Sequence, residues 1–176
     1  MASIPAGTWS IDPVHTSVEF KVKHLGISTY SGRFNDVSGS IESSDGAITR
    51  LTGTAKTESI DVADSNLIGH LKSPDFFDAA AHPEITFSST SAQIAGDDLI
   101  VQGDLTLRGV TKPVELKGEL EGVGDDHMGN TKLGFSLEGV INRNDFGVTW
   151  NAALDNGGQV VGERVKLVLH GQAVKE

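Results

Sequence analysis

The strongest constraint on this chain is the alternation of apolar and polar residues over most of its length. In the segment TSVEFKVKH, Val18, Phe20 and Val22 alternate with charged residues. Because successive side chains of a β-strand point to opposite faces, a period of two predicts strands with one buried face. The same pattern recurs in LTGTAKTESI, EITFSSTSAQI, DLIVQGDLTLRG, PVELKGELEG, KLGFSLEGVI and RVKLVLHGQAV, and less regularly in GRFNDVSGSIES. The sequence therefore predicts about eight strands.

The connections between these segments favour an all-β fold. They are short and contain turn residues, as in SSDGAI, AGDD and DNGG, which leaves no room for the crossover helices of a parallel sheet. Such a chain is typical of an antiparallel β-barrel or a β-sandwich. The 176 residues contain no internal repeat or linker, so residues 1–176 are expected to form a single domain.

One stretch, LIGHLKSPDFFDAAAHPEITF, interrupts the alternation. Between about residues 63 and 81 the sequence predicts a short helical insert, with Asp64 or Ser65 as the N-cap. The part SPDFFDAAA predicts a second helical turn or two, with Ser73 as the N-cap and Pro74 at the first helical position. Phe76 and Phe77 would then point about 100° apart, toward different partners.

Composition excludes several classes of function. Lysine and arginine number 14 against 24 acidic residues, a formal charge of −10, which argues against a nucleic-acid binder because phosphate contacts need clustered cations. Cysteine is absent, which excludes disulfides and thiolate chemistry. The N-terminal MASIPAGTWSIDPVH lacks the basic and apolar regions of a signal peptide. A cytoplasmic protein is therefore expected, or a periplasmic or secreted one if a leader was trimmed.

The apolar faces of the predicted strands contain five glycines, and two explanations fit their presence there. These are Gly53, Gly103, Gly118, Gly139 and Gly171. Glycine weakens a strand, so it either permits the bends of a closed sheet or leaves space along the barrel axis. If a cavity exists, Val22 and Leu105 are among its expected walls, which suit an apolar guest. A solid hydrophobic core explains the same pattern.

No catalytic or metal-binding constellation is evident. The six histidines are scattered without paired ligand spacing, and no GxSxG motif occurs. We therefore predict no catalytic residue, no metal and no cofactor. Arg108 and Arg143 are expected to form salt bridges at the barrel rim.

Four motifs give the chain its resemblance to a known family. WSIDPVHTSVEFKVKHLGISTYSGRFNDVSGSI, HLKSPDFFDAAAHPEITFSST, VQGDLTLRGVTKPVEL and INRNDFGVTW occur in this order over nearly the whole chain. They resemble the motifs of the YceI-like proteins. The resemblance implies an extended, lipocalin-like antiparallel barrel of eight strands. It further implies a long apolar ligand inside it: a polyisoprenoid, an isoprenoid quinone, or a fatty acid or its amide.

The same resemblance implies that the helical insert at about residues 63–81 caps the barrel, and it implies the residues that contact this ligand. The polar groups expected to meet a head group or to lock the insert are His70, Asp75, Arg143 and Asp145. The apolar contacts are expected from Phe20, Val22, Phe34, Phe76, Phe77, Phe87, Leu105, Phe146 and Trp150.

This sequence departs from the pattern of the family in two respects. Family members commonly carry an Arg-Asp pair where this chain has Leu67 and Ile68, which favours a neutral or weakly polar head group. The second departure concerns location, since many relatives look exported whereas no signal peptide is expected here. The family also implies a homodimer.

The main hypothesis is a carrier that transports, stores or sequesters the lipid without catalysis. The alternatives are an enzyme that uses His70, Asp75 or Asp145, and an interaction module with a solid barrel.

Overall fold

A computed structural model describes residues 3–176 as one antiparallel sheet with a single α-helix, α1 (Ser65–Lys72). No helix in these residues is long and apolar enough to cross a membrane. The strands are β1 (Gly7–Ile11), β2 (Ser17–His24), β3 (Ser28–Phe34), β4 (Val37–Ser44), β5 (Ala47–Lys56), β6 (Ile60–Asp61), β7 (Glu84–Ala95), β8 (Asp98–Leu107), β9 (Val110–Asp125), β10 (Thr131–Asn142) and β11 (Val161–Lys175).

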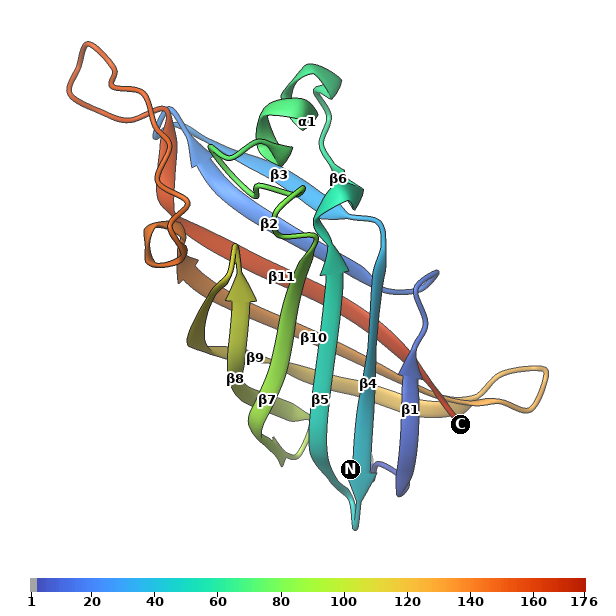
Figure 1. Ribbon diagram of the computed structural model, residues 1–176. Coiled ribbons are helices and arrows are strands. Elements are labelled where there is room, and N and C mark those ends of the chain that lie inside the picture. Colours follow the sequence, from blue (N-terminus) through green and yellow to red (C-terminus); the bar gives the residue numbers. More distant parts are fainter. Residues whose placement is uncertain (1–2) are drawn as a thin grey trace.

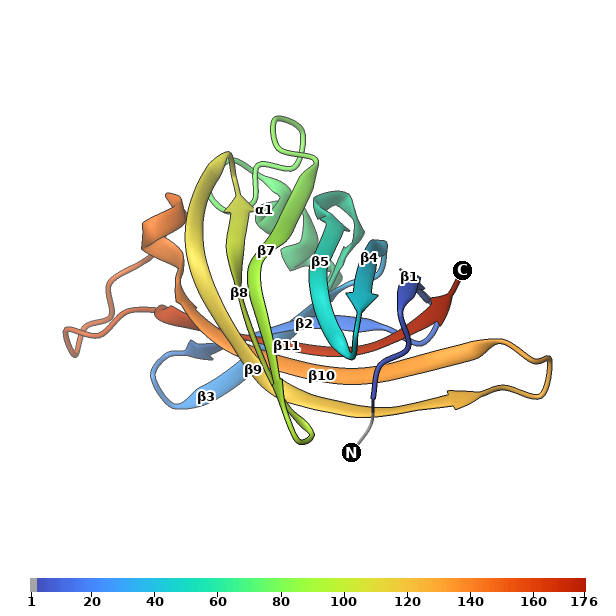
Figure 2. The same ribbon diagram turned by 90° about the horizontal axis from the view of Figure 1, so that it is seen from below.

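Eight of these strands close into a barrel (Figures 1 and 2). The order is β1-β4-β5-β7-β8-β9-β10-β11, and β1 then pairs with β11. Closure joins β1 to β11, so these two strands are not left as open edges with unpaired backbone groups. The eight-stranded antiparallel barrel predicted from the sequence is thus confirmed.

The remaining three strands extend the sheet beyond the point of closure. Residues 161–170 of β11 pair with β2, whereas residues 173–175 pair with β1. β3 then pairs with β2, and β6 with β3. The sheet therefore splits at β11, and the β2-β3-β6 ribbon runs alongside one end of the barrel (Figure 1).

The strand boundaries differ from the expected ones in two places. GRFNDVSGSIES was expected to be one strand, but it divides at Asn35 and Asp36 into β3 and β4. Asparagine and aspartate favour turns because their side chains hydrogen-bond nearby backbone. β1 was not predicted, because five residues are too few to show a clear alternation.

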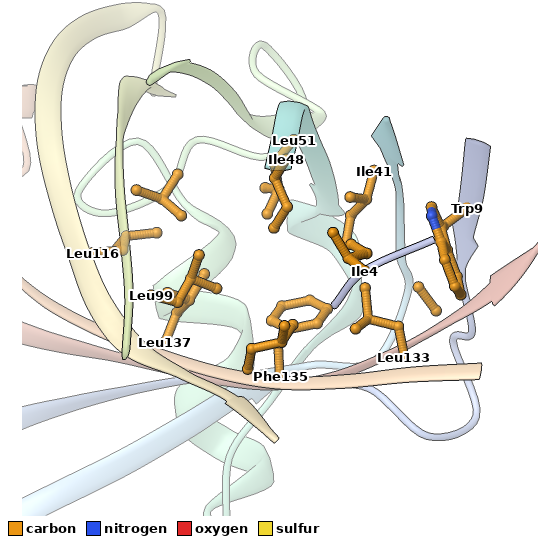
Figure 3. Close-up of a cluster of buried hydrophobic side chains, with 13 residues drawn as sticks. Ile4, Trp9, Ile41, Ile48, Leu51, Leu99, Leu116, Leu133, Phe135 and Leu137 are labelled. Carbon is orange, nitrogen blue, oxygen red and sulfur yellow. The ribbon is translucent and has the colours of Figure 1, made fainter. Parts of the chain in front are cut away.

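One end of the barrel interior is densely packed (Figure 3). Trp9 is fully buried, and its Nε1 donates a hydrogen bond of 2.9 Å to Oγ of Ser43. Around it, Leu133, Phe135 and Leu137 of β10 meet residues from β4, β5, β8 and β9. We call this group, which also includes Ile41, Leu51, Leu99 and Leu116, the floor cluster.

Four of the five inward glycines make room for a neighbouring strand or side chain rather than for empty space. A Cβ atom at Gly171 would lie 2.3 Å from Cζ of Phe135, and one at Gly103 would lie 2.5 Å from Cζ of Phe87. At Gly118 the obstacle is backbone, the carbonyl oxygen of Ser136 at 1.9 Å. Gly139 is crowded by Leu116 and Glu115. At Gly53 alone, no atom would lie closer than 4.0 Å, so only that glycine fits the idea of free space.

The helical insert begins as predicted and then departs from the prediction. Asp64 is the N-cap of α1, because its carboxylate accepts a hydrogen bond of 2.9 Å from the Asn66 amide. The expected second helix does not form. The amides of Phe77 and Ala79 donate instead to the carbonyls of Leu71 and Lys72, so residues 73–81 fold back onto the end of α1. These bonds satisfy carbonyls that a helix end leaves free.

The close approach at Gly118 yields a paired test. Gly118→Ala should lower the free energy of unfolding by about 1–3 kcal/mol, because the methyl group would force β9 and β10 apart. Gly122→Ala on the same strand has no atom within 4 Å, and it should be neutral or slightly stabilising. Urea unfolding of both variants measures the difference. Equal stabilities would contradict the close packing of β9 on β10.

Candidate ligand-binding cavity

An elongated cavity of about 560 Å³ lies between the floor cluster and the helical insert. Small-molecule sites usually fall between about 300 and 1,000 Å³. The cavity follows β2, from Thr16 just before the strand to His24 at its end. At 3.4 Å per residue, this span is roughly 27 Å long. The interior is therefore not the solid core of the interaction-module alternative.

The cavity wall is almost entirely apolar. Its residues come from every strand except β6, and they are mostly aliphatic or phenylalanine side chains. They include Val18, Phe20, Val22, Phe34, Leu51, Ala55, Ile85, Phe87, Leu105, Leu107, Leu116, Phe135, Ile141, Val165 and Leu167. Such a wall favours a hydrocarbon guest by removing its surface from water.

Phe76 and Phe77 lie in the insert and point to different partners. The Phe77 ring contacts Phe34 edge-on at 5.4 Å between centroids and also lies 6.2 Å from Phe20. The Phe76 ring lies 5.4 Å from Trp150 and 4.9 Å from His70. Both phenylalanines line the cavity. Their divergence was expected, although it arises in a non-helical turn.

Arg108 ties the insert to the barrel. Its Nη1 donates hydrogen bonds to the carbonyl oxygen of Pro74 and, at 2.8 Å, to that of Phe76. Arg108 directly follows β8, and with Gly109 it forms the tight turn that joins β8 to β9. The expected salt bridge is not found within residues 3–176. The guanidinium instead fixes the backbone that carries Phe76.

Arg143 is buried and holds the loop that carries Trp150. Its side chain is only 4% exposed. Nε donates to the Gly162 carbonyl at 2.8 Å, and Nη1 donates to the carbonyls of Val148 and Trp150 at 2.8 and 2.9 Å. Nη2 donates to the Val161 carbonyl at 3.1 Å.

No carboxylate pairs with Arg143 among the described residues, so the expected rim salt bridge is wrong here as well. Burial lowers the pKa of the Arg143 guanidinium, and the negative charge of Glu163 opposes this effect. Arginine nevertheless stays protonated in proteins. Four carbonyl dipoles therefore stabilise a buried positive charge, and most of its donors are already used.

His70 and Asp75 form a pair at the edge of the cavity. Nε2 of His70 lies 3.0 Å from Oδ2 of Asp75, and that carboxylate side chain is 54% exposed. The His70 ring also meets Trp150 edge-on at 4.8 Å between centroids. His70 lines the cavity, whereas Asp75 does not. The carboxylate thus orients the imidazole from the solvent side.

The structure brings together most of the residues that the sequence proposed as ligand contacts. Three of them do not reach the cavity: Asp75, Asp145 and Phe146. Asp145 is exposed on a 3₁₀ turn (Arg143–Phe146), and Phe146 is 2% exposed within the packed wall. Those on the cavity are Phe20, Val22, Phe34, His70, Phe76, Phe77, Phe87, Leu105, Arg143 and Trp150.

Sequence reasoning missed several lining residues, of which Tyr30 and Leu67 matter most. Tyr30 lies on β3 in phase with Gly32 and Phe34, directly across from Val22 of β2. The alternation of Tyr30, Gly32 and Phe34 was a usable signal, but the predicted strand GRFNDVSGSIES began at Gly32 and left Tyr30 out. Leu67 lines the cavity from α1, at a position noted only for its departure from the family.

Metal binding has no support in the described part of the chain. No group of three or more histidine, aspartate or glutamate side chains in residues 3–176 is placed to hold an ion. The arrangement offers apolar contact surface, a few engaged polar groups and no clustered acids or bases.

Comparisons with known proteins agree with this geometry. Residues 9–173 match the profile of the YceI-like domain. Protein YceI of an Escherichia coli strain is 42% identical over 136 residues, which cover 76% of this chain and 71% of the relative. A UPF0312 protein of Pectobacterium atrosepticum is 41% identical over 77% of this chain and 71% of its own length.

Solved structures share the fold. The YCEI protein of Campylobacter jejuni superposes with a TM-score of 0.74 at 31% identity, covering 88% of this chain and 90% of that one. BcnA of Burkholderia cenocepacia gives a TM-score of 0.77 at 22% identity over 92% and 98%. A polyisoprenoid binding domain from Saccharophagus degradans gives 0.71 at 14% identity over the full length of both. For these last two structures, which are 22% and 14% identical to this chain, the similarity shows the fold alone.

The carbonyl cage around Arg143 yields a stability prediction. Arg143→Lys should lower the free energy of unfolding by about 2–4 kcal/mol, because one ammonium cannot reach all four carbonyls and buried acceptors are left unpaired. Urea unfolding measures the loss. The control is Arg164→Lys, at an exposed position on β11, which should stay within about 0.5 kcal/mol of the parent. A parent-like stability for Arg143→Lys would show that the cage is dispensable.

Proposed function

This chain belongs to the YceI-like family, and we propose that it binds a long apolar lipid inside its barrel without catalysing a reaction. The proposed guests are a polyisoprenoid, an isoprenoid quinone, or a fatty acid or its amide. The proposed role is transport, storage or sequestration of that lipid. The proposed complex needs no cofactor.

The observation that carries the proposal is the elongated, apolar cavity of about 560 Å³. Burial contributes about 0.8 kcal/mol for each CH₂ group removed from water. A long chain along β2 therefore gains enough to offset the cost of ordering it. A sugar or nucleotide would find few polar partners, because the wall is mostly aliphatic and phenylalanine side chains and the polar groups of His70 and Arg143 already bond to protein.

A structural neighbour supports the same class of ligand. The Saccharophagus degradans domain is described as polyisoprenoid binding. Its barrel matches this chain over its full length, so a comparable guest has a comparable enclosure here.

The engagement of the polar groups supports a purely binding role. His70 is bonded to Asp75, and Arg143 is bonded to four carbonyls. An acid or base needs a titrating group within reach of the reacting atoms. Asp75 and Asp145, which the enzyme hypothesis invoked, lie off the cavity. No observation favours that hypothesis.

Native mass spectrometry of the purified protein, followed by organic extraction, tests the proposal. We expect a stoichiometric mass increment that matches a prenyl chain, a quinone or a fatty amide. If the purified protein carries no lipid, incubation with each of these lipids should produce the same kind of mass increment. A bare mass after every incubation would overturn the binding role.

Substitutions of the aromatic lining test the location of the site. Trp150→Ala and Phe76→Ala should each weaken binding of an added lipid about tenfold, because each removes roughly 1.4 kcal/mol or more of apolar contact. Val140→Ala is the control, since Val140 is 52% exposed and lies off this cavity. Fluorescence titration measures the affinities, and circular dichroism checks folding. Parent-like affinity in both cavity variants would place the site elsewhere.

A further inference from the structure

The hydroxyl of Tyr30 is the one buried side-chain nitrogen or oxygen without a hydrogen-bond partner in residues 3–176. Leaving such a group unpaired costs about 1–3 kcal/mol. Proteins satisfy nearly all their buried polar groups, so an exception calls for an explanation such as a missing ligand or water. A tyrosine is also an unneeded choice for a plain wall, because phenylalanine would fill the same space.

Tyr30 belongs to the cavity wall. It lies on β3 in phase with Gly32 and Phe34, which are buried, and it pairs with Val22 of β2. Tyr30 and Val22 both line the cavity. The position is close to the β2–β3 hairpin, whereas the floor cluster with Phe135 lies at the other end of the cavity wall. The residue that carries the unpaired hydroxyl thus lies at one particular end of the elongated space.

The other polar groups near this end are already committed. The Asp64 carboxylate caps α1, and His70 is bonded to Asp75. Arg143 spends Nε, Nη1 and Nη2 on backbone carbonyls. Lys23 and His24 also border the cavity, but both are exposed to solvent. Tyr30 is therefore the buried donor at this end that has no partner within the protein.

We propose that the Tyr30 hydroxyl binds the head group of the lipid by donating a hydrogen bond to a neutral carbonyl oxygen. Ketones, quinones and amides carry such an oxygen. This inference rests on the proposed lipid-binding function and specifies which end of the guest is recognised. The head group lies beside β3 near the hairpin, and the hydrocarbon tail extends along β2 toward Phe135.

The charge distribution favours a neutral head group over a phosphate. An anion beside Tyr30 would leave water, and the buried guanidinium of Arg143 is already surrounded by carbonyl oxygens. An unpaired buried charge is costly. A carbonyl oxygen loses little hydration and regains one hydrogen bond, so a phenol is a sufficient partner.

The test compares two chains of equal length, 2-nonadecanone and nonadecane, which differ in one carbonyl oxygen. Affinities for the parent and for Tyr30→Phe are measured by displacement of a fluorescent apolar probe. Tyr30→Phe should weaken binding of the ketone about three- to tenfold, the range expected for one neutral hydrogen bond. Binding of the hydrocarbon should be unchanged or slightly tighter, and the empty protein should be at least as stable as the parent.

Thr86→Val is the matched control, because it removes a different hydroxyl that borders the cavity, on β7. It should leave the preference for the ketone intact. A loss of preference equal to that in Tyr30→Phe would show that no particular hydroxyl recognises the head group, and would overturn the inference.

A spectroscopic readout reports on the hydroxyl directly. Tyr30 is the sole tyrosine of the chain, so ¹³C labelling at tyrosine Cζ gives a single resonance. The ketone should shift this resonance more than the hydrocarbon does. Equal shifts, with equal ketone affinity in Tyr30→Phe, would overturn the inference while the lipid-binding function stands. Failure of both chains to bind the parent would instead overturn the function itself.

Discussion

The structure depends on how β11 is paired. Near its C-terminal end β11 pairs with β1 and closes the barrel, whereas over the rest of its length it pairs with β2 and the barrel stays open there. One edge of β11 pairs with β10 over residues 164–174, and the other is divided between β2 and β1. The division falls at Gln172, whose carbonyl accepts from the Asp12 amide and whose amide donates to the Thr16 hydroxyl. The backbone groups at the split are therefore satisfied without a continuous neighbour. This arrangement gives a closed, packed end and a flared end bounded by β2, β3 and β6.

The cavity persists because its two ends are held by different means. At the closed end, the floor cluster is packed by large side chains around Trp9. At the flared end, α1 and the turn after it are held by hydrogen bonds from Arg108 to backbone carbonyls, and the loop that carries Trp150 is held in the same way by Arg143. Cations that bond carbonyls fix loops whose backbone would otherwise lack partners. The aromatic rings are thereby kept around the space instead of collapsing into it.

The chemistry of the enclosed space is simple. Aliphatic and phenylalanine side chains supply affinity through burial, which is proportional to apolar area and does not discriminate head groups. Discrimination needs a polar group that is buried and unpaired, since an unmet hydrogen bond penalises the wrong guest. Tyr30 is the residue in the described chain that fits this condition.

The sequence by itself determined most of the strands, the antiparallel all-β class and much of the apolar wall, because alternation and short turns are local signals. Alternation fits a barrel and a sandwich equally, and the resemblance to the YceI-like motifs favoured the barrel. It also located the insert and the N-cap Asp64. Only the tertiary structure decided what the polar residues do. Arg108 and Arg143 donate hydrogen bonds to backbone carbonyls that lie far away in the sequence, such as those of Phe76 and Gly162. Asp145 is exposed, whereas the neighbouring Phe146 is buried. The inward glycines likewise accommodate neighbours such as Phe135 and Phe87 across strands. Such relations depend on which strands become adjacent, and pairing between distant segments is set by the whole fold rather than by any one stretch.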